Sequence, residues 1–219
     1  MSTQKVNRRA KGEQTRLKIL QAAIEVIATQ GVKATTHRAV AQKADTQLSL
    51  TTYYFKDIKE LVREAILLSS DQMLYTSSEE WRQAFELLDS FDATSLRKVS
   101  VREELCEKLS NLAAHHMHQN ILQRPIGLAV EQIFFTEMVY SAELKDLANK
   151  HIDIMLNQFI MFARYFNKVD PEVDAELTMI ALTRTQYKYL SMDKADINFS
   201  DILAIVKRQL SWVMGLKRQ

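Results

Sequence analysis

A run of polar and aromatic side chains in residues 47–54 has the chemistry needed to contact DNA. If this segment is helical, one side of it carries Gln47, Ser49, Thr52 and Tyr53. These side chains offer hydrogen bonds or flat contacts to base edges, sugars and phosphates. Leu48 and Leu50 are short apolar groups, of which at most one packs inward, so the other is free to meet a thymine methyl group. The segment therefore has the composition of a base-reading helix.

Positive charge gathers in the same part of the chain. Residues 1–60 hold eleven Lys and Arg against five Asp and Glu, a net charge of +6; the whole chain is only +2, so the remainder is −4. Such a basic end on an acidic body is typical of a polyanion contact, although a basic tail is often only solvated. Lys56 and Lys59 lie where charge and helix dipole would both attract a phosphate. The N-terminal residues that could reach along the DNA backbone or into a minor groove are Arg8, Arg9 and Lys11.

The remaining residues that could support catalysis or bind a metal do not form the pattern of an enzyme. His115 and His118 are one helical turn apart and could share a metal, but the sequence indicates no further ligand. The single cysteine, Cys106, excludes an internal disulfide and fits a small, half-buried side chain. Paired carboxylates such as Glu79 and Glu80 have the pattern of a helix surface, and no Gly-rich phosphate loop or Ser-His-Asp pattern stands out. We expect no catalytic residue, no metal and no cofactor, with an all-helical enzyme kept as an alternative.

Composition predicts that long helices position these residues. Only 4 Gly and 2 Pro occur in 219 residues, fewer than turn-rich all-β or βαβ folds need, and no stretch alternates convincingly as a strand would. The polar N-terminus lacks the apolar core of a signal peptide, and no apolar run is long enough to span a membrane. We therefore expect a cytoplasmic, all-α protein of about nine to ten helices with no membrane partner.

The first 60 residues contain start and stop signals that are typical of short helices. We expect a flexible basic arm over 1–12, a helix over about 13–29 and two short helices over 37–43 and about 47–54. A longer helix opens at Asp57, which has capping-box spacing to Glu60. Further helices are expected over about 79–90, 101–118, 126–140, 143–166, 171–190 and 199–216.

Two short helices joined by a tight turn cannot bury their inner faces alone, so they need support from a longer helix. That support can come from Leu17, Leu20, Ile24, Ile27 and Leu61. This is the logic of a helix-turn-helix, whose second helix lies in the major groove. We assign 13–60 to a DNA-binding domain and 61–219 to a second helical domain. The residues that we expect to contact DNA are Thr36, His37, Arg38, Gln47, Leu48, Ser49, Thr52, Tyr53, Lys56 and Lys59.

Residues from about 16 to 61 resemble the DNA-binding domain of the tetracycline-repressor (TetR) family of bacterial regulators. The resemblance is carried by RLKILQAA at 16–23, Gly31, Thr35-Thr36, VAQKA at 40–44 and TTYYFKDIKEL at 51–61. The order and spacing of these pieces make the match strong, although it covers only about a fifth of the chain.

Several positions depart from the family pattern. Asp45 replaces the usual turn glycine, and Asp tolerates a left-handed conformation better than most residues. Thr46 and Gln47 replace the usual Val and Ser, and Ser49 replaces a common Gly. Ile58 stands where Lys is frequent, so a phosphate contact there would pass to Lys56 or Lys59. These changes bear more on operator sequence and affinity than on fold.

The resemblance implies a homodimer and a small-molecule effector. Members usually pair their last two helices, which gives as interface candidates Leu177, Ile180, Tyr187, Leu203, Val206 and Leu210. The effector pocket lies among the middle helices, which gives as candidates His115, Glu131, Phe135, Met138, Gln158 and Phe162. An apolar stripe at helical spacing also fits plain core, and each of these residues could be just that.

The resemblance also implies a repressor that an unidentified effector releases from a near-palindromic, double-stranded operator. A corepressor, a ligand-free regulator and an architectural DNA-binding protein remain alternatives. So does a protein-binding module with a degenerate helix-turn-helix, which Asp45 and Ile58 would favour.

Overall fold

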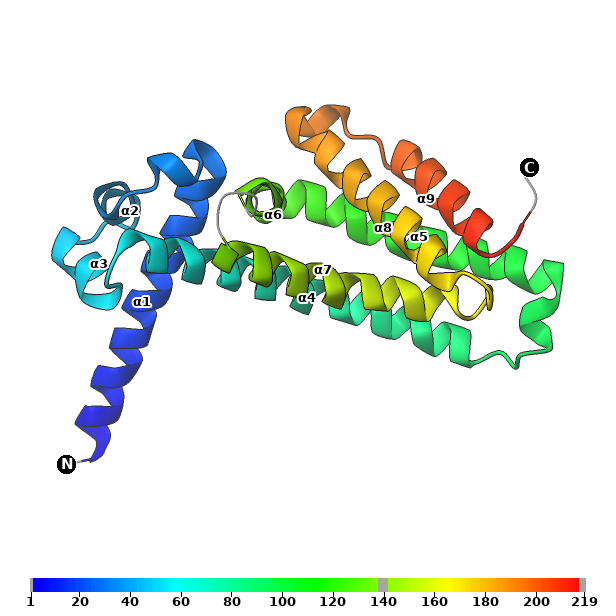
Figure 1. The fold of residues 1–219 in the computed structure, drawn as a ribbon, viewed down its shortest axis with the longest axis horizontal. Helices are drawn as coiled ribbons and strands as arrows, with labels where there is room; N and C mark the ends of the chain where they lie inside the picture. Colours follow the sequence, from blue (N-terminus) through cyan, green and yellow to red (C-terminus); the bar gives the residue numbers. More distant parts are fainter. Residues whose placement is uncertain (1, 138–141, 217–219) are drawn as a thin grey trace. The chain divides into compact units, whose positions relative to one another are not determined.

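A computed structural model describes residues 2–137 and 142–216, and within them the chain is helical with no strand (Figure 1). This confirms the all-α prediction. The nine α-helices of the described residues are α1 (Ser2–Gln30), α2 (His37–Lys43), α3 (Leu48–Tyr54), α4 (Ile58–Asp89), α5 (Val99–Gln123), α6 (Pro125–Glu137), α7 (Ala142–Ala163), α8 (Pro171–Lys188) and α9 (Phe199–Val213).

The chain divides into two compact units. The first comprises residues 1–72 and 129–148, so the division falls inside α4. Its core is built on α1, whose Ile19, Ala23 and Ile27 are fully buried. Phe55 and Leu61, just before and within the start of α4, are equally buried in the same cluster. The first unit therefore has the long supporting helix that the two short helices require.

The second unit comprises residues 73–128 and 149–219. Helices α5 and α9 pack along each other in it, and α8 lies against α9. Leu105 of α5 and Ile202 and Val206 of α9 are fully buried where these helices meet. Over the described residues, none of the helices is long and apolar enough to cross a membrane.

Three expectations about the helices differ from the structure. Helix α1 begins at Ser2, well before the predicted residue 13. Helix α4 is continuous from Ile58 to Asp89, whereas the sequence predicts one helix that opens at Asp57 and a separate one over about 79–90. Ser77 and Ser78 donate their hydroxyls to the carbonyls of Leu74 (3.0 Å) and Tyr75 (2.6 Å), so these polar groups are satisfied within the helix. Bonds of this kind let serines remain inside a helix.

The third difference concerns the inner face of α1. Leu17, predicted to support the short helices, is 47% exposed. At that level of α1 the inward position belongs to Arg16, whose guanidinium lies 5.2 Å from the centre of the Phe55 ring. The buried stripe begins instead at Ile19.

Candidate functional site

A capped helix and a left-handed turn hold α2 and α3 in place. Thr36 begins α2, and its hydroxyl accepts a hydrogen bond from the Ala39 amide (3.1 Å). Asp45 has φ of 45°, so it occupies the left-handed conformation that the missing glycine would have supplied. The Thr46 amide closes the turn on the Ala41 carbonyl (3.0 Å). Local hydrogen bonds therefore fix the angle at which α3 leaves α2.

The inner face of α2 packs on α1, and α3 packs on α2. Val40, Ala41 and Ala44 of α2 are buried, and so is Thr51 of α3. The Thr51 hydroxyl donates to the Leu48 carbonyl (2.8 Å), so this buried polar group is satisfied within its own helix. With Thr51 turned inward, the opposite side of α3 is left for contact with another molecule.

That opposite side carries part of the predicted DNA contacts, and the others lie at the start of α2 and around the start of α4. Of the ten residues, all except the half-buried His37 are exposed; Tyr53 is 78% exposed and Leu48 is 44% exposed. Leu50 is half-buried against the core, so of the two leucines it is Leu48 that remains available. The structure therefore gathers flat, polar and apolar groups on one accessible part of α3. The remaining exposed members of the predicted set are Thr36, Arg38, Gln47, Ser49, Thr52, Lys56 and Lys59.

A capping network orders the turn that carries Lys56 and Lys59. The Glu60 amide donates to Asp57 Oδ1 (2.9 Å), and the Lys56 amide donates to Glu60 Oε2 (2.7 Å). The first of these bonds, together with the Lys59 amide and both lysine charges, lowers the pKa of the Asp57 carboxyl. Because Asp57 occupies the N-terminus of α4, a phosphate there would be bound by the lysine side chains rather than by helix amides.

Two other basic residues of the first unit are used internally. Arg16 pairs with Glu64 (3.0 Å) as well as lying over Phe55, and it joins α1 to α4. Lys43, at the end of α2, pairs with Glu25 of α1 (2.5 Å). Arg16 and Lys43 therefore form ion pairs within the first unit, and the exposed basic residues that we assign to DNA are Arg38, Lys56 and Lys59.

A cavity of about 410 Å³ lies in the second unit, between α4, α5, α7 and α8. Its aromatic lining is Trp81, Phe85, Phe159 and Phe162. The Trp81 and Phe159 rings meet edge to face with centroids 4.9 Å apart. The polar side chains along it include Glu80, His116, Gln158 and Gln186. An apolar cavity with a few converging polar groups is the usual form of a small-molecule site.

The predicted effector residues are divided by the fold. Gln158 and Phe162 line the cavity, whereas His115 packs on Phe199 with ring centroids 4.4 Å apart. Glu131 and Phe135 belong to the first unit, and Met138 lies outside the described residues. The next histidine, His116, reaches the cavity instead. Trp81 and Glu80 also line the cavity and were not among the predicted residues; the predicted helix-surface position of Glu80 holds only in part, because its side chain is 26% exposed and bonds His116.

The last two helices offer an apolar outer face. Leu177 and Ile180 are 56% and 54% exposed on α8, whereas Val206 and Leu210 are buried within the chain's own core and Tyr187 and Leu203 are half-buried. Trp212 of α9 (52% exposed) and Val173 of α8 (56% exposed) were not among the predicted interface residues. Val173, Leu177 and Ile180 follow the spacing that places side chains on one side of a helix. No group of three or more metal-binding side chains occurs in the described parts of the chain.

Comparisons with known proteins agree with this geometry. The family model described as bacterial regulatory proteins, tetR family, matches residues 19–65, which run from α1 into α4. No relative among the curated proteins matches the chain.

Solved structures resemble almost the whole fold. A transcriptional regulator from Rhodococcus sp. Rha1 has a TM-score of 0.70 at 15% identity, over 91% of this chain and 96% of that one. A TetR-like transcriptional regulator from Rhodococcus sp. RHA1 has a TM-score of 0.65 at 15% identity, covering 93% and 97%. Salmonella enterica GusR has a TM-score of 0.58 at 16% identity, covering 92% and 96%. At such identities the likeness establishes the fold, and the family rests on the match over residues 19–65. Residues 19–65 are therefore a helix-turn-helix domain of the bacterial regulatory proteins, tetR family.

Proposed function

We propose that this regulator is a homodimeric repressor that reads a near-palindromic operator with α3 and is released from it by a small molecule. The observation that carries the proposal is the outer face of α3, where Gln47, Ser49, Thr52 and Tyr53 are all exposed on a helix held by a capped, hydrogen-bonded turn. Exposed polar and aromatic groups on the second helix of a helix-turn-helix are what base recognition requires.

The outer face of α8 and α9 supports the dimer. Val173, Leu177 and Ile180 are each more than half exposed at the spacing of one side of α8, and large apolar side chains gathered in this way mark contact surfaces. Trp212 of α9 is also more than half exposed. A dimer formed through this face would carry two copies of α3, and a two-fold symmetric protein reads two symmetric half-sites, which is why a near-palindrome is expected.

The cavity supports release by a small molecule. A ligand that favours a conformation with wrongly spaced α3 helices would weaken operator binding by that difference in affinity. The regulator would act in the cytoplasm, where the DNA is. We assign no catalytic step to its cavity.

Selection of DNA fragments from the source genome tests the proposal. Purified protein should enrich a short near-palindrome and bind it far more tightly than random duplex. Tyr53→Ala should weaken this specific binding by about 1–3 kcal/mol, if the ring makes a base or backbone contact. Tyr75→Ala is the matched control, since Tyr75 is 82% exposed on α4 in the other unit. Binding without sequence preference would favour the architectural alternative, and no binding would refute both.

A further inference from the structure

The cavity contains two buried hydrogen-bond acceptors that lack a donor. Glu80 Oε2 of α4 and Gln186 Oε1 of α8 are both inaccessible to solvent and have no partner among the described residues. Buried polar atoms are almost always hydrogen-bonded, because leaving one unpaired costs stability. Because both residues line one cavity, a donor-bearing molecule bound in it would satisfy both acceptors.

The hydrogen bonds around His116 occupy only one of the two Glu80 carboxyl oxygens. His116 Nδ1 lies 2.8 Å from Glu80 Oε1, and the Asn120 amide donates to His116 Nε2 at 2.8 Å. An imidazole that donates through Nδ1 and accepts through Nε2 is neutral. Burial, the largest influence, accordingly lowers the pKa of His116. The imidazole therefore satisfies one carboxylate oxygen without supplying a counter-charge for the other.

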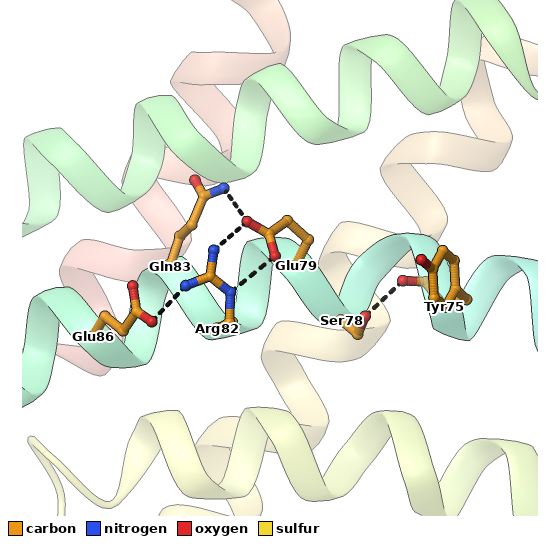
Figure 2. A network of polar contacts seen from close by, with 6 residues as sticks. All are labelled: Tyr75, Ser78, Glu79, Arg82, Gln83 and Glu86. Carbon is orange, nitrogen blue, oxygen red and sulfur yellow. Dashed lines mark hydrogen bonds and ion pairs between the residues drawn. The ribbon is translucent and has the colours of Figure 1, made fainter.

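Arg82, the other charged residue in the lining, forms its hydrogen bonds with Glu79 and Glu86 and not with Glu80. Its guanidinium bonds Glu79 and Glu86 along α4, as Figure 2 shows. Gln83 donates to Glu79 as well (2.9 Å), so this network is closed on the helix surface. Arg124, whose charge opposes protonation of His116, donates to the Thr76 hydroxyl. Neither arginine is hydrogen-bonded to the free oxygen of Glu80.

The remaining walls suit a positively charged, apolar body. Trp81 packs edge to face on Phe159 and stacks on Phe85 with centroids 5.6 Å apart, and it stands beside Glu80 in the sequence of α4. Aromatic faces attract cations, and tryptophan does so most strongly. A carboxylate-bearing ligand would meet like charge at Glu80.

We propose that the ligand of this cavity is an apolar amine, whose N–H groups bond Glu80 Oε2 and Gln186 Oε1 while its hydrocarbon body contacts Trp81, Phe85 and Phe159. This inference rests on the proposed function, in which the cavity is the effector site. It names the chemical class of the effector as cationic and rich in hydrogen-bond donors.

Calorimetric titration of the full chain without DNA tests the ligand class. The probes are 3,3-diphenylpropylamine, 3,3-diphenylpropan-1-ol and 3,3-diphenylpropanoate, which share one body and differ in charge. The amine should bind at least about tenfold more tightly than the alcohol, because the ammonium brings an opposite charge and three N–H donors to Glu80 and Gln186, whereas the hydroxyl brings one neutral donor. The carboxylate should bind more weakly still. Equal affinities for amine and alcohol, tighter binding of the carboxylate, or no binding of the amine would overturn the proposal.

Variants place the effect in the cavity. Glu80→Gln and Gln186→Leu should each lower the affinity for the amine, and Glu80→Gln should remove most of its advantage over the alcohol. Glu104→Gln is the matched control, because Glu104 pairs with Lys108 on the exposed side of α5. If Glu80→Gln fails to fold, Gln186→Leu and the three-probe comparison still decide. Unchanged amine binding in a folded Glu80 or Gln186 variant would contradict the assignment.

Addition of the amine to the protein bound to its selected fragment separates the two proposals. Amine binding that leaves the DNA complex intact would refute release by this site and leave the ligand class standing. A selected palindrome with no amine preference would refute the ligand class and leave the DNA-binding function standing.

Discussion

Lys59→Ala should flatten the salt dependence of DNA binding without changing sequence preference. Lys59 is exposed in the first turn of α4, which is ordered by the Asp57 and Glu60 bonds. Each phosphate neutralised by a lysine contributes about 0.9 to the slope of log affinity against log salt concentration, so a variant dimer that loses two contacts should lose about 1.8. A fourfold rise in salt would then shrink the advantage of the unaltered protein about twelvefold.

The assay is fluorescence anisotropy titration on the selected palindrome and on a random duplex, at about 50 and 200 mM salt. Lys43→Ala is the matched control, because the Lys43 ammonium is already paired with Glu25 at 2.5 Å. The slope for Lys43→Ala should match that of the unaltered protein. The reasoning fails if Lys59→Ala keeps the full slope, if Lys43→Ala lowers it equally, or if Lys59→Ala weakens binding to the palindrome alone.

Three further predictions concern stability and reactivity. Thr36→Ala removes the cap of α2 and should cost about 1 kcal/mol in denaturant unfolding, whereas Thr36→Ser should cost little. Burial raises the pKa of the Cys106 thiol, so at pH 8 a thiol reagent should modify the folded chain far more slowly than the denatured chain; equal rates would contradict this. Hydrogen bonds from Arg82 lower the pKa of Glu79 from 4.5 to about 2. Because the folded pKa is the lower one, the stabilisation is present above pH 4.5 and lost as pH falls toward 2, so any difference in Tm between Glu79→Gln and the unaltered protein should shrink over that range.

The helix-turn-helix could be predicted in detail because short elements are defined by local rules. Helix α2 spans the predicted residues, and α3 and α4 begin within one residue of their predicted starts. Gly31 ends α1 with φ of 80°, and its amide donates to the Ile27 carbonyl at 2.9 Å. Caps and positive-φ turns are determined by a few adjacent residues, so they can be identified without knowledge of the tertiary structure.

The outer surface of α9 could not be predicted in the same way. Apolar residues occur on both sides of this helix: Ile202, Val206 and Leu210 are buried, while Trp212 is 52% exposed. Periodicity shows that a helix has apolar sides, but it does not say which side its own chain covers. That choice is made by α5, which packs on α9 from a distant part of the sequence.

Glu79 and Glu80 illustrate why the α4 side of the cavity was not predicted. The two carboxylates are neighbours in the sequence, yet adjacent residues on a helix do not face the same way. Glu79 turns to Arg82 on the solvent side, whereas Glu80 bonds His116 and lines the cavity. Predicting this difference requires knowing which side of α4 each residue faces, counted along the helix from the buried Ile66. A predicted break at 69–78 makes that count impossible. Because α4 is unbroken, the position of Glu80 on it is fixed and its carboxyl group lies against the cavity. His116 bonds one of its oxygens, and in our proposal the ligand supplies the donor for the other.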